Sequence, residues 1–200
     1  NFLQCLRQSE TPVTVQGKGN VVTVPAGSYT TRVGNFPISI DYASFARQAA
    51  APDVAERAEE LHRRLPQRQI VLGIDRLDYT KGIPQRLLAF PNALERYPEL
   101  RGRISLIQVV VPSRVDIPQY HELKTQIEQL VGEINGKFMR PGGWVPVWYV
   151  YSTLSRSELL AYYRAADIGL VTPLKDGMNL VAKEYCASSI DEESVLILSE

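Results

Sequence analysis

Five short apolar runs, separated by amphipathic stretches, limit the fold of this chain more than any other feature. The runs are IVLGI (70–74), ISLIQVVV (104–111), VPVWYV (145–150), IGLVT (168–172) and VLILS (195–199). Continuous apolar strands that alternate with helices are typical of a parallel sheet covered on both faces, because such strands bury both of their sides. The sequence therefore predicts a doubly wound α/β domain from about residue 41 to residue 200.

Local signals place helices between these strands. Asp41 is a predicted N-cap, Pro52, Pro84 and Pro118 each stand at a predicted helix start, and Ser155 or Ser157 caps a further helix. The predicted helices run over about 42–50, 52–65, 84–97, 118–134, 159–166 and 180–188. Helices of this length, alternating with the five strands, agree with the predicted fold class.

Residues 1–40 show a different pattern. The β-branched runs VVTV (21–24), TTRV (30–33) and FPISI (36–40) predict short strands joined by turns. Residues 1–8 read as the tail of a helix already under way, and the chain stops directly after its last predicted strand. We therefore expect this chain to be an internal portion of a larger protein.

The charge balance and the cysteines exclude several classes of protein. Lys and Arg number 22, and Asp and Glu also number 22, so no overall field attracts nucleic acid or a membrane surface. No apolar run approaches the roughly 18 residues of a spanning helix. Cys5 and Cys186 match no metal or redox spacing. We expect a cytoplasmic protein with reduced thiols, although a disulfide stays open, and with His62 and His121 on the surface.

The connections that leave the strands are where a ligand site is expected. In doubly wound sheets, ligands bind beyond the carboxyl ends of the strands. Four such connections carry polar residues: DRLDYTKG (75–82), PSRVD (112–116), STLSR (152–156) and TPLKDGMN (172–179). Any anion site in this neutral chain must be built locally from these segments.

The first connection carries two cations, Arg76 and Lys81, five residues apart. Arg binds phosphate by bidentate hydrogen bonds and Lys binds it as a point charge, so the pair predicts a binding site for a diphosphate. The alternative is that both cations form weak surface ion pairs with Asp75 and Asp78. The chain contains neither a P-loop nor a G-x-G-x-x-G motif.

The fourth connection opens a helix. Gly177 has the backbone freedom that lets a ligand approach closely. The N–H groups of Met178, Asn179 and Leu180 are predicted to lie at the helix N-terminus, which attracts anions. This segment therefore predicts a second contact for phosphate.

Two acids complete the predicted site. Asp176 and Glu184 suit sugar hydroxyls, although each also has a simpler interpretation, Asp176 as a helix cap and Glu184 as a solvated helix residue. Two cations, a helix N-terminus and two acids together describe a site for a sugar nucleotide. The chain has no Asp-x-Asp pair, so no divalent metal on the diphosphate is indicated.

Several of these segments resemble the trehalose-6-phosphate synthases. The segments are RLDYTKG, PSR, INGKF with the GW and P that follow it, and DGMNLVAKEY preceded by LVTPL. The resemblance runs over about residues 70–200, and more loosely back to residue 1. It implies a GT-B glycosyltransferase with two Rossmann-like domains, in which 1–40 ends the amino-terminal acceptor domain and 41–200 is a truncated nucleotide-sugar domain.

The resemblance also implies a reaction, in which glucose moves from UDP-glucose to glucose 6-phosphate with retention and without metal, giving trehalose 6-phosphate and UDP. It implies a front-face displacement in which the leaving phosphate helps to deprotonate the acceptor. The implied catalytic residues are Arg76, Lys81 and Asp176. The implied donor contacts are Arg76, Lys81, Leu154, Asp176, Gly177, Met178, Asn179, Leu180 and Glu184, with Leu154 meeting uracil through its backbone, and Arg114 is the implied contact for the acceptor's phosphate.

Other functions stay open at this point. One is a sibling glycosyltransferase or pseudo-glycosyltransferase with another donor or acceptor, such as a glucosylglycerol-phosphate synthase. Another is a non-catalytic, regulatory domain that binds a nucleotide sugar. A third is a generic nucleotide-binding module whose charges only form surface pairs. The nucleotide base, the acceptor and a homo-oligomeric state also stay open.

Overall fold

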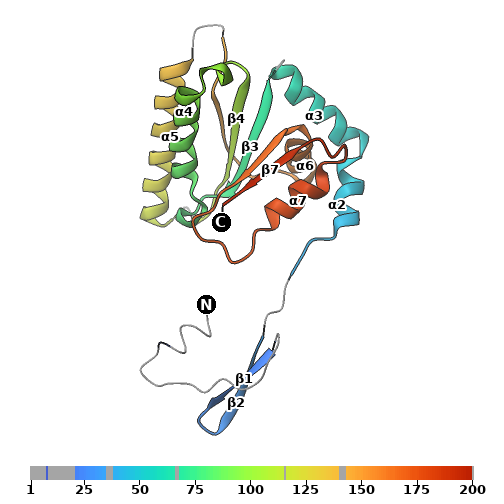
Figure 1. Ribbon diagram of the computed structural model, residues 1–200, viewed down its shortest axis with the longest axis vertical. Helices are drawn as coiled ribbons and strands as arrows, with labels where there is room; N and C mark the ends of the chain where they lie inside the picture. The colour runs from blue at the N-terminus through green and yellow to red at the C-terminus, as the bar shows by residue number, and fades with distance from the viewer. Residues whose placement is uncertain are drawn as a thin grey trace. The chain divides into compact units, whose positions relative to one another are not determined.

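A computed structural model describes residues 8, 21–34, 38–65, 68–114, 116–139 and 143–199. The chain divides into two compact units, Asn1–Ser39 and Ile40–Glu200, which are described separately (Figure 1). None of the described helices is long and apolar enough to cross a membrane.

The first unit contains a β-hairpin. Strand β1 (Val21–Ala26) pairs antiparallel with β2 (Tyr29–Gly34), as the VVTV and TTRV runs predicted. Gly27 has φ 62° in the turn, a left-handed conformation that two-residue hairpin turns require. The predicted strand FPISI is wrong over residues 38–40, which form no strand. Pro37 in this run lacks the N–H that a β-ladder uses; residues 35–37, and 1–7 of the predicted helix tail, lie outside the described residues.

The second unit is built on a parallel sheet of five strands, which confirms the predicted fold class. The strands are β3 (Gln69–Arg76), β4 (Ile104–Val111), β5 (Val147–Tyr151), β6 (Ile168–Val171) and β7 (Val195–Leu198). Their order is β5-β4-β3-β6-β7, so the chain moves outward from β3 to β5 and then crosses back to β6. The carboxyl ends of β3 and β6 therefore mark the topological switch point, where such sheets bind ligands.

Helices follow the predicted positions closely. They are α2 (Tyr42–Ala49), α3 (Pro52–Arg64), α4 (Ile83–Arg96), α5 (Pro118–Phe138), α6 (Arg156–Ala165) and α7 (Leu180–Ser188), with short 3-10 helices η1 (Tyr79–Lys81) and η2 (Pro98–Leu100). Asp41 caps α2, and Ser155 rather than Ser157 caps α6. Helix α5 runs a full turn beyond the prediction. Its last turn is held by the Asn135 amide, which both donates to the Val147 carbonyl (2.9 Å) and accepts from the Val147 N–H (3.0 Å).

The helices cover both faces of the sheet (Figure 1). Successive residues of β3 point to opposite sides: Ile70 and Leu72 pack in the core with α2, α3, α6 and α7, whereas Val71 packs in the core with α4 and α5. The central strands β3 and β4 are buried on both faces, so they have no polar side to expose. This arrangement leaves the strand ends, rather than the sheet faces, for a ligand.

Candidate active site

The first and fourth connections join at the switch point. Strands β3 and β6 are hydrogen-bonded neighbours, and the carbonyl oxygen of Thr80 accepts hydrogen bonds from the N–H groups of Leu174 (2.8 Å) and Lys175 (3.2 Å). Gly82 has φ 66°, and a Cβ at this position would lie 2.6 Å from the carbonyl oxygen of Thr172. The two connections therefore touch through their backbones and present their side chains together.

Lys81 and Asp176 meet across this junction. The Lys81 Nζ lies 2.7 Å from Asp176 Oδ2, and the two side chains are only 16% and 17% exposed. The alternative in which Lys81 pairs with Asp75 or Asp78 is wrong, because its ion-pair partner is Asp176. The structure thus brings together a predicted phosphate ligand and a predicted sugar ligand.

The Asp176 carboxylate is held by several donors. The Asn179 side chain donates to Asp176 Oδ2 at 3.1 Å, in addition to Lys81. Partial burial opposes ionisation, but hydrogen bonds from Lys81, Asn179 and the Met178 N–H outweigh it and lower the pKa of Asp176 below its ordinary value. The carboxylate is therefore ionised and oriented at neutral pH, and it can accept bonds from hydroxyl groups.

Helix α7 begins at Leu180, and its cap is Asn179, whose side-chain oxygen accepts the Ala182 N–H at 3.0 Å. Asp176 lies outside the helix, so its interpretation as the cap of α7 is wrong. Gly177 does not have a left-handed φ, and a Cβ there would meet no atom within 4 Å. The glycine whose conformation the site requires is Gly82, which among the glycines that the structure describes is the one that combines a positive φ with a close backbone contact.

Arg76 is the last residue of β3 and is exposed. Within the described part of the chain, Arg76 forms no ion pair, and Asp75, its neighbour, pairs with Arg86 instead. The guanidinium is therefore available for an anion at the same strand end as Lys81.

Glu184 is partly buried and contacts α6. The hydroxyl of Tyr163 donates to Glu184 Oε2 at 2.9 Å. The interpretation of Glu184 as a solvated helix residue is therefore wrong. Burial, and then the charge of Glu184, raise the pKa of the Tyr163 hydroxyl, so it stays a hydrogen-bond donor.

Arg114 connects the second strand end to the first. Its Nη1 donates to the Tyr120 hydroxyl at 2.9 Å, and that hydroxyl lies 3.5 Å from Asp78 Oδ2. Burial raises the pKa of Asp78, but the bonds from the Thr80 N–H and hydroxyl and the charges of Arg114 and Lys81 prevail and lower it. Arg114 has φ 48°, a strained conformation for a side-chain-bearing residue. Its position after β4, and its link through Tyr120 to Asp78, put Arg114 at the same end of the sheet as Lys81.

A buried polar cluster beneath the site was missed by the sequence reasoning, which treated Asp75 as a surface residue. Arg86 Nη1 donates to Asp75 Oδ2 at 2.5 Å and to Gln108 Oε1 at 3.0 Å, and Arg86 Nε donates to Thr172 Oγ1 at 3.0 Å. Asp75 and Arg86 are 6% and 4% exposed. The available signal was Gln108, a polar residue inside an apolar strand, because a buried polar group needs a partner.

Leu154 is partly buried and packs against the core shared by α2, α3, α6 and α7. Its predicted backbone contact with uracil stays a prediction. Of the residues seen as surface features, His62 and His121 are exposed and Cys186 is a free, exposed thiol, whereas Cys5 lies outside the described residues.

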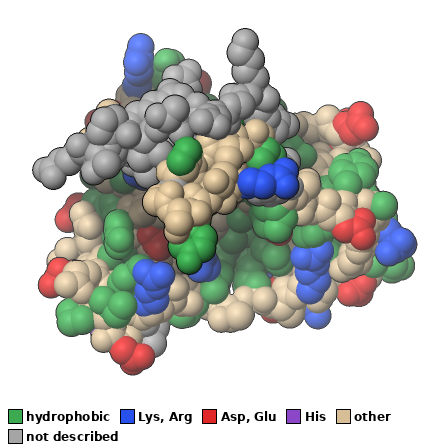
Figure 2. Space-filling view, turned by 90° about the horizontal axis from the view of Figure 1, so that it is seen from below, with side chains coloured by type: hydrophobic (Ala, Val, Ile, Leu, Met, Phe, Trp, Pro, Cys, Tyr) green, Lys and Arg blue, Asp and Glu red, His purple; other side chains and the backbone are tan. Residues whose placement is uncertain are grey.

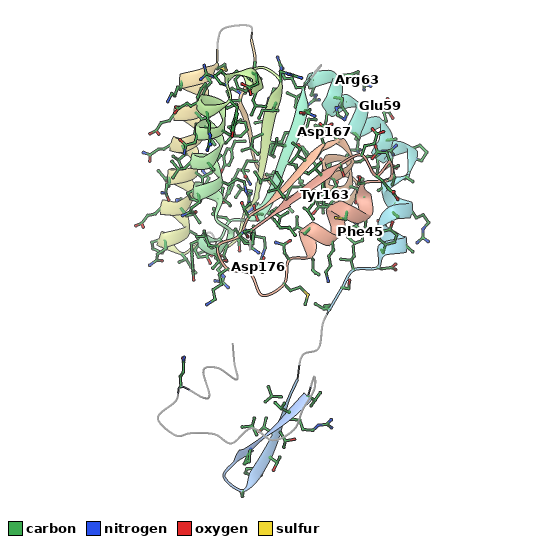
Figure 3. The ribbon with its side chains drawn as sticks, viewed as in Figure 1. Phe45, Glu59, Arg63, Tyr163, Asp167 and Asp176 are labelled. Atoms are coloured by element: carbon green, nitrogen blue, oxygen red, sulfur yellow. The ribbon has the colours of Figure 1, made fainter. Side chains whose placement is uncertain are left out.

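The site offers one local set of charges rather than a field over the whole surface. Figure 3 shows Asp176 at the lower edge of the sheet, and Figure 2, viewed from that side, shows acidic and basic side chains interspersed. Among the described residues, no three His, Cys, Asp or Glu side chains gather as a metal site would need. The arrangement suits an anion at Arg76 and Lys81, with hydroxyl groups at Asp176 and Glu184.

Known proteins resemble this chain in sequence and in fold. Residues 1–200 match the profile of glycosyltransferase family 20. A bifunctional trehalose-6-phosphate synthase/phosphatase from Thermoproteus tenax is 46% identical over 177 residues, which are 88% of this chain and 24% of that protein.

Two solved structures share the fold. An α,α-trehalose-phosphate synthase (UDP-forming) from Burkholderia xenovorans, in complex with glucose-6-phosphate, has a TM-score of 0.91 and 35% identity over 98% of this chain and 43% of its own. An E. coli structure, "Trehalose-6-phosphate from E. coli bound with UDP-2-fluoro glucose", has a TM-score of 0.88 and 37% identity over 100% of this chain and 43% of its own. The chain thus spans less than half of the length of these relatives.

Proposed function

Because the chain belongs to glycosyltransferase family 20, we propose that the full protein transfers glucose from UDP-glucose to glucose 6-phosphate with retention, releasing UDP and trehalose 6-phosphate. The names of the relatives support this reaction, as does the glucose-6-phosphate in the Burkholderia xenovorans complex. The E. coli structure with UDP-2-fluoro glucose supports a UDP-sugar donor.

In this proposal residues 41–200 bind the nucleotide sugar, and residues 1–40 end the domain that binds most of the acceptor. The separation of the described contacts into Asn1–Ser39 and Ile40–Glu200 supports this division. Arg114, at the end of β4, reaches toward the phosphate of the acceptor. Glucose 6-phosphate would therefore meet the donor at the carboxyl ends of the strands.

One observation carries the proposal: Lys81 and Asp176, from connections 95 residues apart, form a single shielded pair at the switch point. A cation beside an oriented carboxylate is complementary to a diphosphate joined to a hexose, because the cation binds the phosphate oxygens and the carboxylate accepts hydrogen bonds from the sugar hydroxyls. Lys81, with Arg76, contacts the diphosphate, and Asp176 accepts bonds from hydroxyls of the donor glucose. The N–H groups of Gly177, Asn179 and Leu180 add neutral donors for phosphate and sugar oxygens, whereas the Met178 N–H donates to Asp176.

The proposed chemistry relies on charge that develops at the diphosphate. The acceptor hydroxyl attacks the anomeric carbon on the face that the diphosphate leaves, and its proton passes to a diphosphate oxygen as the glycosidic bond breaks. Negative charge grows on UDP during this step, so Arg76 and Lys81 stabilise the transition state more than the bound donor. Glu184 holds the ribose, and Leu154 meets uracil through its backbone. Arg76 and Lys81 supply the positive charge that a metal ion supplies in metal-dependent enzymes.

The test is Lys81→Ala in the full-length protein. Removing one preorganised charge should lower kcat by about 10²-fold, comparable to deleting one oxyanion donor, while Arg76 and the α7 N-terminus keep the donor bound. Lys175→Ala is the matched control, because Lys175 is an exposed lysine of the fourth connection with no assigned role. Steady-state kinetics measure kcat, and calorimetry with UDP-glucose measures affinity.

Two results would count against the proposal. Unchanged kcat with a collapse of donor affinity would limit Lys81 to holding the ligand. Equal, small effects of Lys81→Ala and Lys175→Ala would place the phosphate site elsewhere. Running the assay with UDP-, GDP- and ADP-glucose, with and without glucose 6-phosphate, tests donor and acceptor identity and separates a synthase from a sibling enzyme or a non-catalytic binding domain.

A further inference from the structure

Tyr163 is a buried tyrosine whose hydroxyl bonds to a predicted ligand residue. It lies on α6 and is 2% exposed, inside the layer that contains α6 and α7 (Figure 3). Its ring packs edge-on against Tyr185, with centroids 6.3 Å apart. Most buried phenols find a hydrogen-bond acceptor, and here the acceptor is Glu184 Oε2 at 2.9 Å.

The bond restrains a flexible side chain. A glutamate loses about 1–2 kcal/mol of rotamer freedom when it is fixed. Within the described part of the chain, Tyr163 is the one side-chain donor bonded to the Glu184 carboxylate. A carboxylate has about four lone-pair sites, so one bond to Tyr163 leaves the others for a ligand. The Glu184 carboxylate is thereby held in one orientation before any ligand arrives.

The phenol is suited to act as a permanent donor. Burial in an apolar layer and the adjacent carboxylate both favour its protonated form, as described above. The phenol therefore stays protonated at neutral pH and donates to the Glu184 carboxylate.

We propose that Tyr163 is a positioning residue, which presents the Glu184 carboxylate to the ribose hydroxyls of a nucleoside diphosphate without touching the ligand. This inference rests on the proposed function, because that function supplies the ribose role of Glu184. It adds a residue from α6, on a connection that carries none of the diphosphate ligands, to the determinants of nucleotide binding.

The test compares two tyrosines in the full-length protein. Tyr163→Phe removes the bond to Glu184 and keeps the ring. Tyr185→Phe is the matched control, because Tyr185 is also 2% exposed and its hydroxyl donates to the Ala166 carbonyl at 2.9 Å, away from Glu184. Glu184→Gln gives the reference loss of UDP affinity with which the loss in Tyr163→Phe is compared. Calorimetry measures the binding of UDP and of pyrophosphate. Thermal unfolding confirms that each variant is folded.

Glu184→Gln is expected to weaken UDP binding by roughly 10- to 150-fold, the range for a hydrogen bond to a charged group. Tyr163→Phe is expected to weaken it by roughly 3- to 10-fold, a fraction of that loss, and Tyr185→Phe by less than about 2-fold. Pyrophosphate binding should stay unchanged in all three. In a Glu184→Ala background, Tyr163→Phe should have no further effect on UDP binding, because the side chain that the Tyr163 hydroxyl holds is absent.

The possible failures are distinguishable. If Glu184→Gln weakens UDP binding but Tyr163→Phe does not, the positioning role is overturned while the proposed function stands. If Tyr163→Phe and Tyr185→Phe weaken UDP binding equally, the effect is structural and the inference is overturned. The same holds if Tyr163→Phe weakens pyrophosphate binding as well as UDP binding. If Glu184→Gln leaves UDP binding unchanged, the ribose assignment fails, and the positioning role fails with it.

Discussion

Replacing Gly82 by alanine tests whether the first and fourth connections must touch for the site to form. Gly82 has φ 66°, and its added Cβ would lie 2.6 Å from the carbonyl oxygen of Thr172 and 3.4 Å from Leu174 Cγ. The left-handed conformation costs an alanine about 1–2 kcal/mol. An ordinary carbon–oxygen contact is about 3.3–3.6 Å, so the backbone at Thr172 must move by about 0.7–1 Å.

This displacement defines the expected result. Overpacking of this kind costs about 1–3 kcal/mol, so Gly82→Ala should lower the free energy of unfolding by about 2–5 kcal/mol in total. Thr172 precedes Asp176, and a misplacement of about 1 Å in an active site can lower the rate by about 10²-fold. We therefore expect a loss of kcat/KM of that order in the protein that remains folded.

Gly102→Ala is the matched control. Gly102 has φ 79°, but a Cβ there would meet no atom within 4 Å. This variant should lose only the about 1–2 kcal/mol of backbone strain and keep its activity. Urea denaturation and steady-state kinetics on the full-length protein measure both quantities. Equal destabilisation of the two variants, with activity retained in Gly82→Ala, would refute the reasoning that the contact with Thr172 shapes the site.

Three further predictions concern charge. In the proposed function Arg76 and Lys81 bind the diphosphate without a metal, so donor turnover should persist in excess chelator; a loss that Mg²⁺ restores would contradict this. Asp176 has a lowered pKa in the folded state, so its stabilising contribution is present above the ordinary Asp pKa and is lost as pH falls through the folded-state value. The unfolding free energies of wild type and Asp176→Asn, followed by urea denaturation, should therefore converge as the pH falls below the ordinary Asp pKa; a difference that does not change with pH would contradict it. Arg86→Met leaves Asp75 buried without its cation and should cost about 3–5 kcal/mol of stability by the same method; a loss below about 1 kcal/mol would mean that Asp75 is solvated.

Much of the fold could be predicted from local patterns. The apolar run at 104–111 and the prolines at 52 and 118 mark elements whose boundaries the structure reproduces, because burial on both faces and helix starts have strong local signatures. The exceptions have tertiary causes. Helix α5 continues to Phe138 because Asn135 bonds to β5, a strand that local sequence cannot place beside it.

The sequence by itself determined the fold class and the polar connections that leave the strand ends, from which the candidate ligand residues were predicted. Arg76, Lys81, Asp176 and Glu184 could be selected because parallel sheets direct their carboxyl-end connections to one edge. The order of the strands was not readable, since strand pairing depends on contacts between residues far apart in the chain.

Only the tertiary structure decided which side chains meet. In the structure Lys81 forms an ion pair with Asp176. Asp75, which the sequence placed at the surface, is buried in an ion pair with Arg86. Glu184 accepts a hydrogen bond from Tyr163. Ion pairs and hydrogen bonds require separations of about 3 Å, which depend on packing across the whole domain, whereas burial patterns survive shifts of several ångströms. The physical reason is the precision that each property needs. The hydrophobic periodicity of the sequence reflects the average burial of each residue, whereas the chemistry of a site depends on individual distances between atoms.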